Sequence, residues 1–302
     1  MPQATIAVIG GTGFIGRHLL EGLTAQAPLV RVLVHAVAPS WLESLTTVEV
    51  VKGDLLEPTS LDALVGGATC VINLAGQVSP DVGDYQSVNL RGMVNLAQAC
   101  VRHRAPRMIH ASSALVYGTI LGATEESPCR PISPYATMKL AAEEILSSLL
   151  APTTEMLSLR LSNVYGPGQR NGLMPYLVKR ILKREPITID ADGAQVRDFV
   201  HVGDVVTAFL KAIDASGCTG AMNIGSGEAT SIMTLLRLLE DVLEMPATGQ
   251  YCPEHSGGER KNTVNVSRAQ DTLGWQTSIV LAEGIQTLLA SKQAGMGERM
   301  YA

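Results

Sequence analysis

Residues 8–16 read VIGGTGFIG, with Gly10, Gly13 and Gly16 at every third position. A short apolar, β-branched run precedes the three glycines, and residues 14–26 have apolar side chains at helical spacing. Glycine allows a tight turn between a strand and a helix, and it lets backbone N–H groups approach a diphosphate at the helix N-terminus. Since both flanking elements are present, the segment predicts the first βαβ unit of a dinucleotide-binding sheet.

Strand-like and helix-like segments alternate along the first half of the chain. Short apolar segments predict strands, and longer segments with apolar residues at helical spacing predict helices. The expected strands cover 5–10, 29–35, 48–54, 70–76 and 107–113, and a further strand with a loop is expected over 156–166. The expected long helices cover 14–26, 87–103 and 136–150. This alternation predicts an α/β fold, a Rossmann-type doubly wound parallel sheet covered by helices on both faces.

The pattern is less regular in the second half. A strand, a turn and a second strand are expected over 187–202, and a last helix over 281–291. We therefore expect a dinucleotide-binding domain over 1–165, with returns near 198–225, and a smaller α/β C-terminal substrate lobe over 166–302.

The composition argues against several classes of protein. A formal net charge of −5 speaks against a nucleic-acid surface, and no run approaches the roughly 18 apolar residues of a membrane-spanning helix. The N-terminal residues lack the basic start of a signal peptide. The cysteines form no CxxC pair, which argues against zinc or a disulfide framework: Cys70, Cys100, Cys129, Cys218 and Cys252. We expect a protein of the reducing cytoplasm with no metal.

The end of the second expected strand bears on the choice of cofactor. In dinucleotide-binding sheets an acidic residue at this point commonly holds the ribose 2′-OH of NAD. The chain has His35 instead, so NAD and NADP both remain open. Asp54, in the GDL turn after the third strand, could bind an adenine amino group or could simply stabilise the turn.

Tyr135 and Lys139 lie four residues apart in SPYATMK, residues 133–139, and therefore share one face of the expected helix. A lysine ammonium beside a phenol lowers the pKa of the phenol, so that the tyrosine can accept or donate a proton near neutral pH. The same spacing occurs by chance in many helices. Ser112 and Ser113 favour the catalytic interpretation, because they end a parallel strand at the edge where open α/β sheets bind ligands. For either serine, a simple turn residue is the alternative.

With these motifs the chain resembles the extended short-chain dehydrogenase/reductase family, in its NAD-dependent epimerase/dehydratase branch, and within it the UDP-glucose 4-epimerases. The resemblance runs over nearly the whole length. It rests on GGTGFIG (10–16), GDL (53–55), NLAG (73–76), VNLRGMVNL (88–96), SSALVYG (112–118), SPYATMK (133–139), LRLSNVYGPG (159–168), VRDFVHVGDV (196–205), NIGSG (223–227) and LGW (273–275).

The resemblance implies roles for particular residues. Tyr135 would be the catalytic acid and base, Lys139 would bind the nicotinamide ribose and tune Tyr135, and Ser113 would orient a sugar hydroxyl. Further cofactor contacts would come from Gly10, Gly13, Phe14, Ile15, Gly16, His35, Asp54, Leu55, Leu74, Ala75, Gly76 and Asn89. Contacts to a nucleotide-diphosphate sugar would come from Ser113, Asn163, Gly172, Leu173, Arg197 and His255.

The predicted phosphate contacts of Arg197 and His255 are not equally well supported by the sequence. Arg197 suits a diphosphate on chemical grounds as well, because a guanidinium can bind phosphate through two parallel hydrogen bonds. At the position of His255 the family usually carries an arginine that binds a phosphate of the substrate. The nearest arginine in this chain is Arg260. The phosphate contact from this loop therefore departs from the family's pattern.

Ala114 and Leu115 narrow the reaction that the resemblance implies. Sugar 4,6-dehydratases of the family carry Asp-Glu at these places, decarboxylases a glutamate and 3,5-epimerases a cysteine, whereas neither side chain here can move a proton. Transfer of one hydride and one hydroxyl proton remains, which fits both a 4-epimerase and a reductase. The likeness of the segments LMPY (173–176) and VRDF (196–199) to those of 4-epimerases favours 4-epimerisation of a nucleotide sugar with bound NAD, through hydride abstraction, a 4-keto intermediate and hydride return.

Two other functions remain as alternatives. One is an NAD(P)H-dependent reductase of a 4-keto nucleotide sugar. The other is a non-catalytic NADP-binding regulator, which is disfavoured because Ser113, Tyr135 and Lys139 are all present. The family likeness also implies a homodimer that pairs the helices over 87–103 and 136–150.

Overall fold

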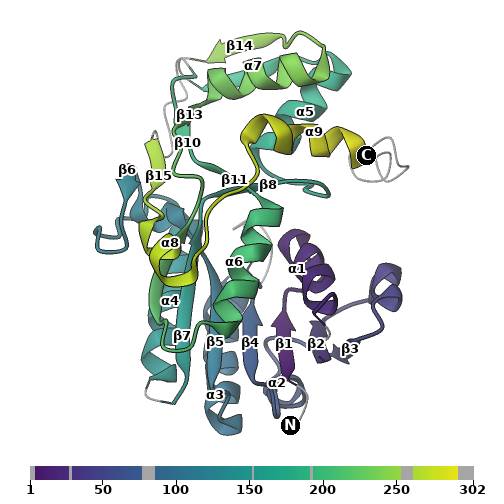
Figure 1. Ribbon diagram of the computed structural model, residues 1–302, viewed down its shortest axis with the longest axis vertical. Helices are drawn as coiled ribbons and strands as arrows, with labels where there is room; N and C mark the ends of the chain where they lie inside the picture. Colours follow the sequence, from purple (N-terminus) through teal and green to yellow (C-terminus); the bar gives the residue numbers. More distant parts are fainter. Residues whose placement is uncertain are drawn as a thin grey trace.

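The computed structural model describes residues 4–26, 29–76, 86–151, 153–190, 193–252 and 261–291. Its centre is a parallel sheet of seven strands in the order β12-β7-β5-β4-β1-β2-β3 (Figure 1). The strands are β1 (Thr5–Ile9), β2 (Leu29–Val34), β3 (Val48–Lys52), β4 (Cys70–Asn73), β5 (Arg107–Ser113), β7 (Glu155–Leu161) and β12 (Gly220–Ile224). The prediction of a Rossmann-type doubly wound sheet is confirmed, and the chain order reverses between β1 and β4.

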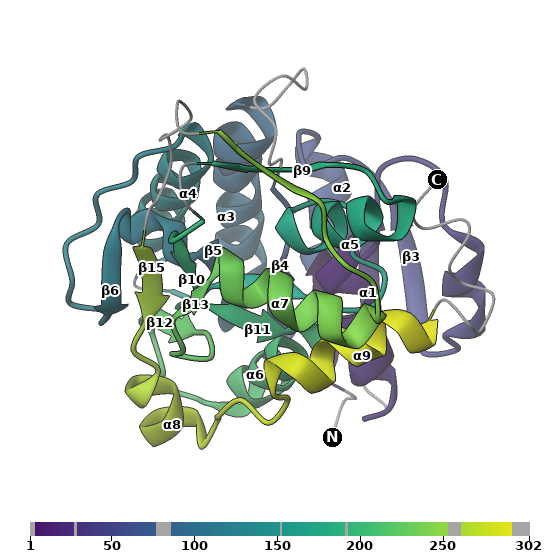
Figure 2. The same cartoon turned by 90° about the horizontal axis from the view of Figure 1, so that it is seen from above.

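Helices cover both faces of this sheet, because alternate residues of each strand face opposite sides. Ile6 and Val8 belong to one buried cluster, and Ala7 and Ile9 belong to another. The first cluster includes α1 (Phe14–Thr24) and α6 (Val202–Asp214); the second includes α2 (Pro58–Val65), α3 (Gly92–His103) and α4 (Pro134–Leu150). In Figure 2, α3 and α4 lie on one side of the strands and α6 on the other.

A third buried cluster lies beyond the carboxyl edge of the large sheet (Figure 1). It is built from α5 (Leu173–Lys183), α7 (Ile232–Leu243) and α9 (Leu281–Ser291), with β9 (Ile187–Asp190), which pairs with β14 (Gly249–Cys252). The last helix agrees with the one predicted over 281–291. The division at residue 165 stays a prediction, and α6 and β12 belong to the large sheet and its cover.

The segment predicted as a strand with a loop over 156–166 contains a second short strand where the loop was expected. β7 ends at Leu161, and β8 (Asn163–Tyr165) pairs with β11 (Phe199–His201) outside the large sheet. The chain changes partner at Ser162, whose N–H bonds Ile224 O, whereas the next N–H bonds Asp198 O, both at 2.9 Å. This change turns the chain from the large sheet toward the third cluster.

Several short elements lie outside the predicted pattern. The helix predicted over 87–103 begins with a π-helical turn before α3, Ser87–Arg91. The region predicted as strand, turn and strand separates into β9, β10 and β11, which join three different small sheets. One of these sheets has the order β13-β10-β15-β6, from Thr230–Ser231, Val196–Arg197, Lys261–Val264 and Ile120–Ala123. Further unpredicted helical elements are η1 (Ser40–Ser44), η3 (Ala114–Tyr117) and α8 (Ser267–Leu273). In the parts of the chain that the structure describes, no helix is long and apolar enough to cross a membrane.

The glycine loop is packed backbone against backbone. Gly10 has a φ of +76°, and a Cβ at this residue would lie 2.7 Å from Ala75 N. A Cβ at Gly16 would lie only 2.3 Å from Gly10 O, so the first turn of α1 touches the loop that precedes it. The close approach of β1, α1 and the end of β4 therefore requires glycine at these positions.

We expect Gly16→Ala to lower the free energy of unfolding by about 1–3 kcal/mol, because the added methyl group must displace backbone. Gly13→Ala is the matched control, since its Cβ would come no closer than 3.3 Å to Gly10 O. Urea unfolding of the two variants measures the difference. Equal stability of the two variants would contradict the packing argument.

Candidate active site

A cavity of about 560 Å³ lies where the glycine loop, the ends of β4, β5 and β7, and the start of α5 meet. This is the carboxyl edge of the large sheet, where open α/β sheets bind ligands. The predicted site residues in its wall are Gly10, Gly13, Phe14, Ile15, Gly16, Leu74, Gly76, Ser113, Tyr135, Lys139, Asn163, Gly172 and Leu173. Residues that were predicted from separate motifs therefore line the same cavity.

The other predicted cofactor residues lie behind the wall or at the edge of the sheet. Ala75 packs against Gly10, and buried Asn89 has its Oδ1 beside Gly76. His35 and Asp54 lie together after β2 and β3, with His35 Nδ1 3.2 Å from a carboxylate oxygen. Leu55 packs against Gly92. Cofactor contacts from these residues stay predictions.

Arg197, one of the two predicted phosphate contacts, is not among the described residues that line the cavity. Arg197 is half-buried in β10, and its Nη1 donates a hydrogen bond to Val196 O at 3.0 Å. His255 lies outside the described residues. A role for either residue in binding phosphate therefore stays a prediction.

Tyr135 and Lys139 lie in the first turns of α4. Ser133 caps this helix by accepting a hydrogen bond from Ala136 N, and Pro134 opens its first turn. The Lys139 Nζ donates to Ala111 O at 2.8 Å and lies 5.9 Å from the centre of the Tyr135 ring. The amine is therefore held between β5 and the phenol.

Burial changes the pKa of the Lys139 ammonium. The side chain is almost fully buried, and removal from water lowers the pKa of its ammonium to about 8, although the Glu143 carboxylate favours the charged form. A Cβ at Gly76 would lie 2.9 Å from the Lys139 Nζ, so glycine at this position leaves room for the amine. At neutral pH the cationic form still predominates beside Tyr135.

Ser113 ends β5 and begins the short η3 turn. Its Oγ accepts a hydrogen bond from Leu115 N at 3.2 Å. Ala114 and Leu115 also line the cavity, and neither side chain can transfer a proton. Tyr135 is therefore the proton donor and acceptor best placed at this end of the cavity.

The sequence motifs did not predict two residues of the cavity wall that carry a buried amide oxygen. Gln169 Oε1 and Asn262 Oδ1 have no hydrogen-bond partner among the described residues. Their orientation is set by the amide nitrogens: Asn262 Nδ2 donates to Ala114 O and Gly118 O, and Gln169 Nε2 donates to Val164 O. A buried acceptor without a partner is costly, so both oxygens fit a ligand with hydroxyl or N–H donors.

The glycine loop fits a dinucleotide. The backbone N–H groups of the first turn of α1 follow Gly13, which has no side chain to cap them, and a diphosphate can therefore approach them. Gly10, Gly13 and Gly16 lie in the same cavity wall as Lys139. One cavity can thus hold a dinucleotide and a second ligand beside Tyr135.

Comparisons with known proteins agree with this arrangement. The model of the NAD dependent epimerase/dehydratase family matches residues 6–225. A UDP-glucose 4-epimerase of Mycolicibacterium smegmatis is 31% identical over 298 residues, which cover 92% of this chain and 95% of the relative. The structure of MoeE5 in complex with UDP-glucose and NAD has a TM-score of 0.88 at 30% identity, covering 97% of this chain and 99% of MoeE5. The UDP-glucose 4-epimerase of Thermus thermophilus in complex with NAD has a TM-score of 0.86 at 29% identity, covering 96% of this chain and 99% of that enzyme.

We expect the Lys139 ammonium to titrate near pH 8, because burial lowers its pKa to about 8. The measurement is an NMR titration of the protein carrying ¹³Cε-labelled lysine, with Lys139→Met to assign the resonance. Exposed lysines serve as the internal control and titrate near the ordinary value of about 10.4. A Lys139 resonance that titrates with the exposed lysines would show that the amine is in contact with water.

Proposed function

Because the chain belongs to the NAD dependent epimerase/dehydratase family, we propose that it is a nucleotide-sugar 4-epimerase that works with bound NAD. One observation carries the proposal: Ser113, Tyr135 and Lys139 share a cavity wall with the glycine loop. At the neighbouring positions Ala114 and Leu115 offer no further acid or base. The site is thus equipped for transfer of one hydride and one hydroxyl proton.

Bound NAD would supply the hydride acceptor for the sugar carbon and, once reduced, the hydride donor for the opposite face of the keto sugar. The glycine loop would hold its diphosphate at the N-terminus of α1, and Lys139 would bind the nicotinamide ribose. A cycle that begins and ends with oxidised cofactor needs no exchange of NAD. We therefore expect the cofactor to stay with the protein.

The residues of the chain move one proton and orient one hydroxyl. The Tyr135 Oη takes the proton of the sugar C4 hydroxyl as the carbon loses its hydride, and it returns that proton at the end of the cycle. The Lys139 ammonium favours the phenolate form of Tyr135. The Ser113 hydroxyl orients the reacting oxygen from the end of β5.

We propose a UDP sugar as the substrate. The relatives support this, since the M. smegmatis protein is a UDP-glucose 4-epimerase and MoeE5 is seen with UDP-glucose. Gly172 and Leu173 start α5 at the cavity, on the side of the third cluster. We place the diphosphate and base there, and the sugar hydroxyls near Gln169 and Asn262.

A cytoplasmic homodimer completes the proposal. The free thiols of Cys70, Cys100, Cys129 and Cys218 suit a reducing compartment. α3 and α4 carry the partly exposed apolar side chains Val101 and Leu149, which suit the pairing of these helices between two copies.

We expect the purified protein to release about one NAD per chain on denaturation and to interconvert UDP-glucose and its C4 epimer. Tyr135→Phe is expected to lower kcat by about 10²–10⁴-fold, because it removes the proton acceptor, while NAD stays bound. Mass spectrometry identifies the released dinucleotide, and chromatography of the nucleotide sugars follows turnover.

Other outcomes point to the other functions. A protein that is purified without cofactor, binds NADPH tightly and reduces a 4-keto sugar would be a reductase. Binding of neither dinucleotide would exclude both enzymes. Turnover of Tyr135→Phe at the wild-type rate would refute the assigned role of the phenol.

Gln169→Leu is expected to raise the KM for the UDP sugar about 2–13-fold, the range that corresponds to one neutral hydrogen bond of about 0.5–1.5 kcal/mol. The Gln169 Oε1 is a buried acceptor in the cavity wall. Gln270→Leu, at an exposed position on α8, is the control and is expected to leave KM unchanged. An unchanged KM in Gln169→Leu would mean that the substrate does not contact this oxygen.

A further inference from the structure

A buried ion pair lies between α4 and β7, and β7 is the neighbour of β5, the strand that ends at Ser113. Arg160 Nη2 donates to Glu143 Oε2 at 2.7 Å, and Arg160 Nε lies 3.1 and 3.2 Å from the two carboxylate oxygens. Each side chain is only 8% exposed. Neither residue lines the cavity, so the pair does not touch the substrate region directly.

Each member of the pair also holds one side of Ser113. The Ser112 hydroxyl donates a hydrogen bond to a Glu143 carboxylate oxygen, directly before Ser113 in β5. Arg160 Nη1 donates to the Tyr117 hydroxyl at 2.9 Å, and the guanidinium carbon lies 4.9 Å from the Tyr117 ring. Tyr117 ends the η3 turn that begins after Ser113. The residue before Ser113 and the turn after it are therefore tied to the same ion pair.

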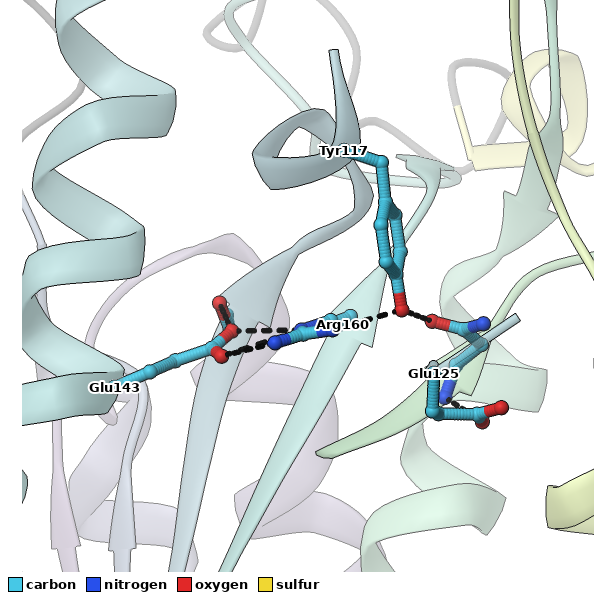
Figure 3. Close-up of polar contacts among 6 residues, drawn as sticks. Tyr117, Glu125, Glu143 and Arg160 are labelled. Carbon is cyan, nitrogen blue, oxygen red and sulfur yellow. Dashed lines mark hydrogen bonds and ion pairs between the residues drawn. The ribbon is translucent and has the colours of Figure 1, made fainter. Parts of the chain in front are cut away.

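The Tyr117 hydroxyl continues the network toward β12. It donates to Asn223 Oδ1 at 2.7 Å, and the backbone N–H of Asn223 donates to Glu125 Oε1 at 2.8 Å (Figure 3). Burial raises the pKa of the Tyr117 phenol to about 12, so the hydroxyl remains a donor at neutral pH. The η3 turn is thus held from two sides.

The position of Glu143 on α4 connects this network to the reacting groups. Glu143 follows Lys139 by four residues and Tyr135 by eight, and i, i+4 and i+8 lie along one face of a helix. One helix face therefore presents the phenol and the amine to the cavity and the carboxylate to Ser112. A shift of Glu143 would change the distance between α4 and the end of β5.

We propose that Glu143 and Arg160 are positioning residues that fix Ser113 relative to Tyr135 and Lys139, an inference that rests on the proposed 4-epimerase function. The pair ties α4 to the residue before Ser113 and to the turn after it. Stability alone does not require such a pair, because well-packed apolar residues often replace a buried ion pair without loss. The contacts to Ser112 and Tyr117 assign the pair instead to the arrangement of the reacting groups.

The experiment is a double-mutant cycle on the full-length protein, with Glu143→Met, Arg160→Met and the double variant. Each single variant leaves one buried charge unpaired and is expected to lower the melting temperature. In the double variant we expect recovery of the melting temperature and of bound NAD, a KM for UDP-glucose within about threefold of wild type, and a kcat lowered about 10–100-fold. Recovery of kcat together with stability would show a purely structural role and overturn the inference.

Two further single variants leave the ion pair intact, so they test the inference even if the double variant does not fold. Tyr117→Phe removes the link to the η3 turn, and Ser112→Ala removes the link to β5. Each removes one hydrogen bond to a charged group, a contact that corresponds to about 13–160-fold. Because only part of that loss falls on the position of Ser113, each is expected to lower kcat at least about threefold with NAD still bound. Wild-type kcat in both would overturn the inference.

Glu144→Gln is the matched control, because Glu144 is the exposed neighbour of Glu143 on the same helix. It is expected to leave kcat, KM and the melting temperature unchanged. Wild-type protein is assayed first. An inactive wild type overturns the proposed function and this inference with it, whereas an active wild type with an active, stable double variant overturns the inference alone.

Discussion

The carboxyl ends of seven parallel strands meet at one edge of the large sheet, and the cavity depends on this constraint. Right-handed crossovers bring every strand back to the same starting edge, so the residues that follow β1, β4, β5 and β7 become neighbours. The glycine loop, Gly76 and Ser113 therefore meet at this edge. Only the close backbone packing at Gly10 and Gly16 lets β1 and α1 approach that edge.

The second half of the chain is fastened to this edge by buried polar groups. The Asp198 carboxylate accepts hydrogen bonds from Ser162, Ser226, Gly227 and Val264. It therefore joins the residues that follow β7 and β12 to β15 at one point. Burial raises the pKa of this carboxyl, and the hydrogen bonds to the charged form oppose the rise. The same logic holds for the Glu143–Arg160 pair: each buried charge is tolerated because its partners are already in place.

Polar groups around the reaction site divide into two kinds. Lys139, Glu143 and Arg160 have their partners within the protein, and these contacts hold the reacting groups in fixed positions. Gln169 and Asn262 keep an amide oxygen without a partner among the described residues, and these oxygens suit a ligand. The division separates residues that arrange the site from residues that recognise what enters it.

The sequence by itself determined the fold class, the glycine loop and the Tyr135–Lys139 face, because each is encoded in spacings within one or two adjacent elements. The strand end indicated Ser112 and Ser113 alike, and the resemblance to the family selected Ser113. Only the tertiary structure decided that Asn262 reaches Ala114 across 148 residues, and that Arg160 on β7 pairs with Glu143 on α4. The second strand within 156–166 and the small sheets were likewise decided only by the tertiary structure. Such contacts depend on how distant elements pack, and no local periodicity records that packing.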